Sequence, residues 1–315
     1  MKITRGLDSF DAPAGGYILA VGNFDGVHLG HQRIFETAVR QAEAMGLTAG
    51  LLTFSGHPLQ VLRPDEAPQP LMVLEDRLKI ARTFGFKKAF ILEFDAGLAS
   101  MSPERFTEEI LIRSAGAAGI VAGRQWRFGS GRRGNMDLLK EIARELNLTV
   151  LAVDPLTVDG QPVSSTRIRD LIAMGDVAKA RTFLGRPHFV RGTVQRGRGR
   201  GKELGFPTVN LDTGNVMIPP GGVYAGAYIF SGRSGPAAIN VGHSPTFEDS
   251  IPGVEAHLIG WDGDIYGSTV TVAFLERLRP GKAFADTGAL SRQIALDVDR
   301  TLEIFTSGAI EGIPR

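Results

Sequence analysis

Two histidines that lie three positions apart, His28 and His31, give the first indication of chemistry in this sequence. They follow an apolar run at 17–21 and open a stretch in which apolar residues recur at helical spacing. The start of a helix presents unpaired backbone N–H groups and the positive end of the helix dipole, which together attract phosphate. Gly30, between the histidines, lets a ligand approach the backbone closely. The segment therefore predicts a site that stabilises charge on a phosphorus centre.

Two simpler interpretations of these histidines stay open at this point. In the first, the histidines cap the helix that follows; in the second, they bind zinc. Zinc needs additional nitrogen, oxygen or sulfur ligands, and the chain contains no cysteine that could supply them. Zinc binding is therefore the weaker of the two interpretations.

Three hydroxyl residues, Ser164, Ser165 and Thr166, are of the types that favour the N-cap of a helix. Arg167 and Arg169 follow in what would be the first helical turn, where positive charge is unfavourable for the helix itself. The pattern indicates an anionic ligand nearby. An ordinary capped helix with solvated arginines explains it equally well.

The segment 191–202 contains five cations and four glycines but no acidic residue. It would clamp ATP, bind nucleic acid or form a solvated loop. The residues that follow favour the ATP clamp, because Thr208 and Asn210 are two apart on an expected strand and so point the same way. A hydroxyl and an amide oxygen suit Mg²⁺, which also binds substrate phosphates.

The first half of the chain alternates between two patterns. Short apolar runs lie at 17–21, 49–54, 88–94, 119–123 and 149–153, and helical stretches lie at 34–45, 74–83, 103–114 and 136–146. This alternation predicts a parallel sheet with helices on both faces, and ligands of such sheets bind at the carboxyl ends of the strands. The histidine segment follows the first strand, where this rule places a site.

The pattern changes after Gly185-Arg186-Pro187, which ends a helical segment that runs from Thr166 to Leu184. Strand-like runs follow at 189–194, 222–230, 237–241, 254–261 and 268–275, and a helix at about 290–305 closes the chain. These runs predict a small antiparallel barrel or sandwich. We therefore predict two domains, 1–185 and 186–315.

Composition limits the partners. The net charge of +1 gives no overall attraction to nucleic acid or to an anionic membrane. No apolar run approaches the ~18 residues that a membrane span needs, and Asp8 and Asp11 interrupt any signal-peptide core. The absence of cysteine fits a reducing compartment, so we expect a cytoplasmic protein. The oligomeric state stays open.

Four segments resemble, in order, motifs of bacterial FAD synthetases: 22–32, 53–58, 123–129 and 163–169. The resemblance implies that His28, His31 and Arg167 stabilise charge on the phosphates. It implies that the nucleotide contacts Gly22, Asn23, Phe24, Asp25, Gly30, Ser164, Ser165 and Thr166. It implies that the flavin contacts His57, Gln125, Trp126, Arg127 and Phe128.

The segment 205–211 resembles the Pro-Thr-x-Asn motif of riboflavin kinases, and the segments 222–226, 240–247 and 254–258 support this resemblance. It implies that Thr208 and Asn210 hold Mg²⁺ and that Glu255 takes the proton from the 5′-hydroxyl of riboflavin. It implies that ATP contacts Gly199, Gly201, Lys202, Gly205, Pro207 and Thr208.

Both resemblances together imply a bifunctional enzyme of flavin cofactor synthesis. The expected fold is an α/β Rossmann-like nucleotidyltransferase domain followed by a small antiparallel β-barrel with a C-terminal helix. The expected reactions convert riboflavin and ATP to FMN, then FMN and ATP to FAD and pyrophosphate, with Mg²⁺ at both sites. The expected partners are these small molecules, and neither nucleic acid nor membrane.

Three alternatives compete with this interpretation. The first is a riboflavin kinase with a weakened or nucleotide-binding-only N-terminal domain, favoured by Gln125 and Trp126, which depart from the usual flavin-side loop. The second is a flavin-responsive regulator that binds nucleic acid through the cationic segment 191–202. The third is a nucleotidyltransferase with another acceptor, such as pantetheine phosphate, against which the kinase-like second half argues.

Overall fold

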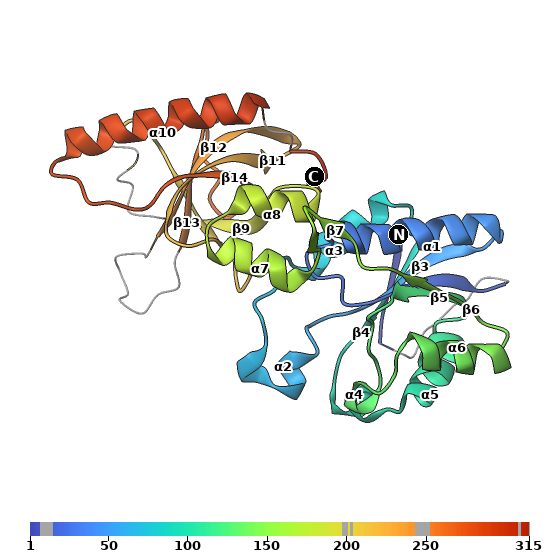
Figure 1. Cartoon of the computed structure of the whole chain (residues 1–315). Coiled ribbons are helices and arrows are strands. Elements are labelled where there is room, and N and C mark those ends of the chain that lie inside the picture. The colour runs from blue at the N-terminus through green and yellow to red at the C-terminus, as the bar shows by residue number, and fades with distance from the viewer. Residues whose placement is uncertain (7–14, 197–200, 202–203, 243–252, 308–309, 315) are drawn as a thin grey trace. The chain divides into compact units, whose positions relative to one another are not determined.

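A computed structural model describes the chain except for residues 7–14, 197–200, 202–203, 243–252, 308–309 and 315 (Figure 1). The chain divides into two compact units, Met1–Val163 and Ser164–Arg315. Each unit has its own sheet and its own buried core.

The first unit contains a parallel sheet in the order β1-β4-β3-β2-β5-β6. Its strands are β1 (Lys2–Arg5), β2 (Tyr17–Val21), β3 (Thr48–Phe54), β4 (Lys88–Leu92), β5 (Ala117–Gly123) and β6 (Thr149–Val153). The five apolar runs of the sequence are all strands of this sheet. The runs in β2, β3, β4 and β5 are largely apolar because these strands lie inside a parallel sheet that is buried on both faces, whereas β6 is an edge strand.

Helices cover both faces of this sheet (Figure 1). They are α1 (Leu29–Ala44), α2 (Leu59–Leu62), α3 (Leu74–Thr83), α4 (Ala96–Ser100), α5 (Pro103–Arg105) with the π-helical stretch Phe106–Ser114, and α6 (Met136–Glu145). Short 3₁₀ turns at Pro64–Glu66 and Ser130–Arg132 and the hairpin β7 (Thr157–Val158) and β8 (Gln161–Pro162) complete the unit. The predicted α/β architecture is confirmed.

The second unit begins with two helices, α7 (Ser165–Ala173) and α8 (Val177–Leu184). The sequence predicted one helix here. Gly175 breaks it with a φ of +79°, and Asp176 caps α8 by accepting a hydrogen bond from the backbone N–H of Lys179. Because α8 packs against β9 and β14, the helix pair belongs to the same compact unit as the strands that follow it.

Those strands form a closed antiparallel barrel in the order β10-β13-β12-β11-β14-β9. They are β9 (His188–Gln195), β10 (Val209–Asp212), β11 (Gly222–Phe230), β12 (Arg233–Gly242), β13 (Gly253–Leu258) and β14 (Thr269–Arg279), and α10 (Thr287–Ser307) follows. The sequence left barrel and sandwich open; the unit is a barrel, with Tyr224, Ile239 and Phe274 among its fully buried side chains.

A buried histidine at the start of the barrel makes the stability of this unit depend on pH. The Nε2 of His188 lies 2.8 Å from the carbonyl oxygen of Met217, and the ring stacks on Phe274. Burial lowers the pKa of His188 from 6.5 to about 4. The neutral form is therefore favoured in the folded state, so stability is complete above pH 6.5 and is lost as the pH falls toward 4.

We expect the unfolding free energy of the second unit to fall by up to about 3 kcal/mol over this window because of His188. The chain has two tryptophans, Trp126 in the first unit and Trp261 in the second. Urea unfolding followed by Trp261 fluorescence, in a chain with Trp126→Phe, measures the second unit. His188→Asn should lose this part of the pH dependence; an unchanged pH profile in that variant would refute the assignment.

Candidate active sites

Three loops with predicted site residues leave the carboxyl ends of three adjacent strands, β3, β2 and β5. The chain leaves β2 toward β3 on one side, and it leaves β5 toward β6 on the other. Such a reversal opens a crevice at the carboxyl edge of the sheet, where α/β proteins bind ligands. The topology thus places the histidine loop, the segment after Phe54 and the segment after Gly123 around one point.

The loop from Gly22 to His28 has a constrained backbone. Phe24 and Val27 have φ values of +54° and +37°, which residues other than glycine rarely adopt. The Phe24 ring packs edge-on against Phe35 at 4.8 Å and against His31 at 5.3 Å. A Cβ on Gly22 would lie 2.9 Å from the Phe24 ring, so no larger residue fits there without a shift. Packing against the ring therefore fixes the shape of the loop.

The two histidines lie against each other at the start of α1. His28 is the N-cap residue, and its Nδ1 accepts a hydrogen bond of 3.3 Å from the backbone N–H of His31. The two rings stack at 3.5 Å, and His28 is 6% exposed. A Cβ on Gly30 would approach the His28 ring to 3.2 Å, so glycine permits this stacking. His28 caps the helix, and the cap places both imidazoles at the phosphate-attracting end.

Asp25, predicted to contact the nucleotide, is buried. Its carboxylate accepts hydrogen bonds of 3.0 and 3.1 Å from the backbone N–H of Leu71. This bond holds the loop after β2 against the chain that leads into α3. The carboxylate therefore has an anchoring function of its own.

The segment predicted to meet the flavin is an aromatic cluster. Trp126 stacks on Phe128 with ring centroids 4.4 Å apart, and Phe106 lies 5.8 Å from Phe128. Phe128 is buried, Trp126 is half-buried, and Gln125 and Arg127 are exposed. A flat aromatic surface of this kind suits the stacking of a planar ring.

In two other predicted segments, a side chain accepts a hydrogen bond from the backbone a few residues along the chain. His57 is half-buried, and its Nδ1 accepts a hydrogen bond from the backbone N–H of Leu59. Ser164 caps α7 by accepting a hydrogen bond of 3.2 Å from the backbone N–H of Arg167. The Nε of Arg167 has no hydrogen-bond partner in the described part of the chain.

The barrel brings together the residues predicted for the second site. The Thr208 hydroxyl donates a hydrogen bond of 2.5 Å to Glu255. Asn210 on β10 lies directly opposite Glu255 on β13, and Asn240 on β12 lies opposite Glu255 on the other side. Cross-strand partners point to the same face of a sheet, so these polar side chains form one row. Asn240 had not been singled out in the sequence.

Two cavities of the barrel unit share one wall residue, Thr208. One, of about 640 Å³, extends from Glu255 to α10 and has mainly apolar walls that include Phe206, Val223 and Phe284. The other, of about 440 Å³, is lined by Trp261 and Tyr266 among others. Thr208 lies on the wall of both cavities. The residue whose hydroxyl contacts Glu255 is therefore part of the wall of each cavity.

Of the glycines predicted to hold ATP, Gly201 lies beside this hydroxyl. A Cβ on Gly201 would lie 2.5 Å from the Phe206 carbonyl oxygen and 2.9 Å from Thr208 Oγ1, so a side chain there would displace the motif. Gly205 has a φ of +85°. The Pro207 carbonyl accepts a hydrogen bond from His257. Gly199 and Lys202 lie outside the described residues.

The hydroxyl of Thr208, the amide of Asn210 and the carboxylate of Glu255 are hard oxygen donors, which fit Mg²⁺. Among the described residues, no group of three His, Asp or Glu side chains could hold a metal. A metal here would therefore depend on the threonine, the asparagine and the phosphates of a substrate.

Two family models match the chain in order. One, described as FAD synthetase, matches residues 11–167, and one described as riboflavin kinase matches residues 184–305. A Bacillus subtilis protein named bifunctional riboflavin kinase/FMN adenylyltransferase is 32% identical, over 92% of this chain and 93% of that protein. One of the same name from Pseudomonas fluorescens is 33% identical, over 95% of this chain and 96% of that protein. The chain belongs to the bifunctional riboflavin kinase/FMN adenylyltransferase family.

A solved structure shows the same fold. A protein from Streptococcus pneumoniae, described as a macrolide-efflux protein, superposes with a TM-score of 0.87 and 29% identity. The match covers 96% of this chain and 99% of that chain. In the present chain, none of the described helices is long and apolar enough to cross a membrane.

Membership of the flavin-synthesis family confirms the predicted family, the fold of both parts and the enzyme class. The roles of individual residues stay predictions. His28 and His31 belong to the first unit and Arg167 to the second, so the grouping of these three also stays a prediction.

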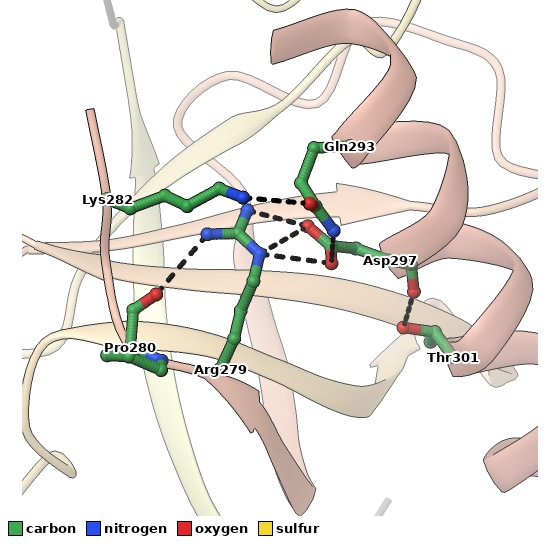
Figure 2. A network of polar contacts seen from close by, with 6 residues as sticks. All are labelled: Arg279, Pro280, Lys282, Gln293, Asp297 and Thr301. Atoms are coloured by element: carbon green, nitrogen blue, oxygen red, sulfur yellow. Dashed lines mark hydrogen bonds and ion pairs between the residues drawn. The ribbon is translucent and has the colours of Figure 1, made fainter. Parts of the chain in front are cut away.

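A network of polar side chains forms part of one wall of the larger cavity (Figure 2). Asp297 on α10 accepts hydrogen bonds from Nε and Nη2 of Arg279, at 2.7–3.1 Å, and from Gln293 at 3.1 Å. Lys282 donates to Gln293 at 3.2 Å. Arg279 and Lys282 both lie over the Phe284 ring. The network thus joins the end of β14 to α10.

Removing the charge of Asp297 should loosen this wall, because the Arg279 guanidinium then loses its counter-charge in a largely buried place. We expect Asp297→Asn to lower the unfolding free energy of the second unit by about 3 kcal/mol and to raise the KM for riboflavin. Asp299 is exposed on the same helix, so Asp299→Asn should change stability by less than about 0.5 kcal/mol. Equal effects of both variants in urea unfolding would argue against a network at Asp297.

Proposed function

We propose that this chain phosphorylates riboflavin to FMN at the barrel and adenylylates FMN to FAD at the carboxyl edge of the parallel sheet. The observation that carries the proposal is the position of Thr208, which contacts Glu255 and lies on the wall of two cavities. A kinase that joins two substrates needs such a meeting point, with a carboxylate at the place of transfer.

At the barrel, we assign riboflavin to the larger cavity, because its apolar walls suit a flat ring and because Glu255 lies on it. We assign the nucleotide to the smaller cavity, together with Gly199, Gly201, Lys202, Gly205, Pro207 and Thr208. The 5′-hydroxyl oxygen attacks the γ-phosphorus of ATP, Glu255 takes the hydroxyl proton, and ADP leaves. Mg²⁺, held by Thr208 and Asn210, would supply positive charge to the phosphates when bound.

At the parallel sheet, the phosphate of FMN attacks the α-phosphorus of ATP and pyrophosphate leaves. No covalent enzyme intermediate is needed. His28, His31 and Arg167 stabilise the charge on the phosphates. The backbone of Gly22, Asn23, Phe24 and Gly30 and the cap residues Ser164, Ser165 and Thr166 bind the nucleotide. His57, Gln125, Trp126, Arg127 and Phe128 bind the flavin, and Asp25 contributes to the nucleotide site by anchoring its loop.

We also propose that the functional boundary lies between residues 185 and 186. The start of the riboflavin kinase match at residue 184 supports it. Helices α7 and α8 then belong to the adenylyltransferase by sequence motif, although they pack with the barrel. The cytoplasmic location stays a prediction that rests on the absence of cysteine.

Incubation of the purified protein with ATP, Mg²⁺ and riboflavin tests the proposal, with riboflavin, FMN and FAD separated over time. We expect FMN to rise first and FAD to follow, and we expect supplied FMN to give FAD without a lag. FMN that accumulates without FAD would instead indicate a kinase whose N-terminal domain only binds nucleotide. Absence of both products would refute the proposed function.

A further inference from the structure

A buried arginine outside the motifs lies beneath the proposed adenylylation site. Arg77 on α3 is 4% exposed. Its Nη1 lies 3.2 Å from Thr53 Oγ1, 3.2 Å from the carbonyl oxygen of Phe54 and 3.4 Å from Asn23 Oδ1. The Thr53 hydroxyl also donates to the carbonyl oxygen of Asn23 at 3.2 Å. One guanidinium thus contacts two segments that are distant in sequence.

These two segments have different substrates in the proposed function. Asn23 belongs to the loop after β2, which we assign to the nucleotide. Thr53 and Phe54 end β3 and lead into the segment that contains His57, which we assign to the flavin. Arg77 therefore fixes the nucleotide loop relative to the start of the flavin segment.

The burial of this charge is costly, and the contacts that Arg77 makes do not fully compensate this cost. Desolvation lowers the pKa of Arg77, and the charges of Asp25 and Glu75 only oppose that shift. No carboxylate hydrogen bond to Arg77 is present among the described residues, and its Nε has no partner there. A buried charge of this kind is a poor way to stabilise a fold, since an apolar side chain often does as well.

The backbone next to Asn23 has a conformation that needs restraint by its neighbours. Phe24, next to Asn23, has a φ of +54°, and such a conformation persists only where surrounding contacts impose it. Asp25 is held by Leu71 from one side, and Asn23 is held by Arg77 and Thr53 from the other.

We propose that Arg77 is a positioning residue for adenylyl transfer, which holds the nucleotide loop and the flavin segment in the mutual position that in-line attack requires. The inference rests on the proposed function. In-line transfer is sensitive to the placement of the reacting atoms, and a displacement of about 1 Å can cost about 10²-fold in rate.

Two variants and one control test this role. Arg77→Met removes the donors and the charge, and Arg77→Lys keeps the charge but replaces the planar guanidinium with a single ammonium. Arg82→Met is the control, because Arg82 is an exposed arginine on the same helix. Each variant is made in the full chain with both tryptophans kept, because Trp261 lines the cavity assigned to the kinase nucleotide. Far-UV circular dichroism checks that each variant is folded.

The rate of FAD formation from FMN is measured at saturating ATP and FMN, below the unfolding transition. We expect kcat to fall about 10²-fold in Arg77→Met and at least about tenfold in Arg77→Lys, with a higher KM for both ATP and FMN. Arg82→Met should match the parent chain. Riboflavin phosphorylation in the same samples should stay within about twofold of the parent, because the kinase site lies in the other unit.

A folded Arg77→Met or Arg77→Lys chain with the parent kcat would overturn the inference, even if its melting temperature fell, because Arg77 would then serve stability alone. Loss of folding in both variants would also overturn it. A parent chain that makes no FAD would refute the proposed function itself, and this result is distinguishable because it does not depend on Arg77.

Discussion

Replacement of Glu255 by glutamine should lower the kcat of riboflavin phosphorylation by roughly 10²- to 10⁴-fold, the usual contribution of a general base. The amide cannot take the proton from the 5′-hydroxyl, although it has nearly the size of the carboxylate. It can still contact Thr208, whose hydroxyl donates to Glu255. We therefore expect little change in the affinities for riboflavin and ATP.

FAD formation from supplied FMN should continue in Glu255→Gln, because the phosphate nucleophile needs no deprotonation by Glu255. Glu276 on β14 provides a control, since it lies on the same barrel and pairs with Arg300 at the surface. Glu276→Gln should leave both rates unchanged. A kinase rate within about threefold of the parent in Glu255→Gln would make Glu255 a structural residue of the strand, because general-base help is much larger.

Replacement of His28 by alanine should reduce FAD formation by at least about 10²-fold, the typical loss when one positioned donor to a charged transition state is removed. The variant also removes the N-cap of α1 and the ring that stacks on His31. FMN formation from riboflavin should remain nearly intact, because the kinase site lies in the second unit.

His28→Asn separates the two functions of this residue. Asparagine is a good N-cap, so it should restore the stability of the first unit without restoring FAD formation. Circular dichroism and Trp126 fluorescence check the fold of both variants. If FAD and FMN formation vanish together in a folded His28→Ala chain, the two sites are not independent and the account is wrong.

The sequence predicted the central strands of the first unit well, because strands buried on both faces appear as continuous apolar runs. It missed β1, a four-residue edge strand in which only Thr4 is buried and Lys2, Ile3 and Arg5 are exposed. It also joined α7 and α8 into one helix, because the apolar spacing continues across Gly175.

The sequence predicted the part of the second site that depends on spacing within one strand. Thr208 and Asn210 are two apart, and their spacing alone indicated a shared direction. The alignment of Asn240 with Glu255 depends on the pairing of β12 with β13, and local periodicity contains no information about the register between strands.

Buried charges were missed for a different reason. Arg77 shares one helix face with Leu74, Leu78 and Ala81, at spacings of three, four and seven residues. A charge on an apolar face was the available signal, but periodicity assigns charged residues to solvent by default. Asp297 on α10 is a second example, since its partner Arg279 lies on β14.

In the proposed function, one chain transfers two different parts of ATP to the flavin, the terminal phosphoryl group at the barrel and the adenylyl group at the parallel sheet. Parallel incubations of the parent chain with riboflavin, Mg²⁺ and ATP labelled at either the γ- or the α-phosphorus distinguish the two transfers. We expect the γ label first in FMN and then in FAD, and the α label in FAD alone. An α label absent from every flavin, or a γ label absent from FMN, would contradict the proposed function.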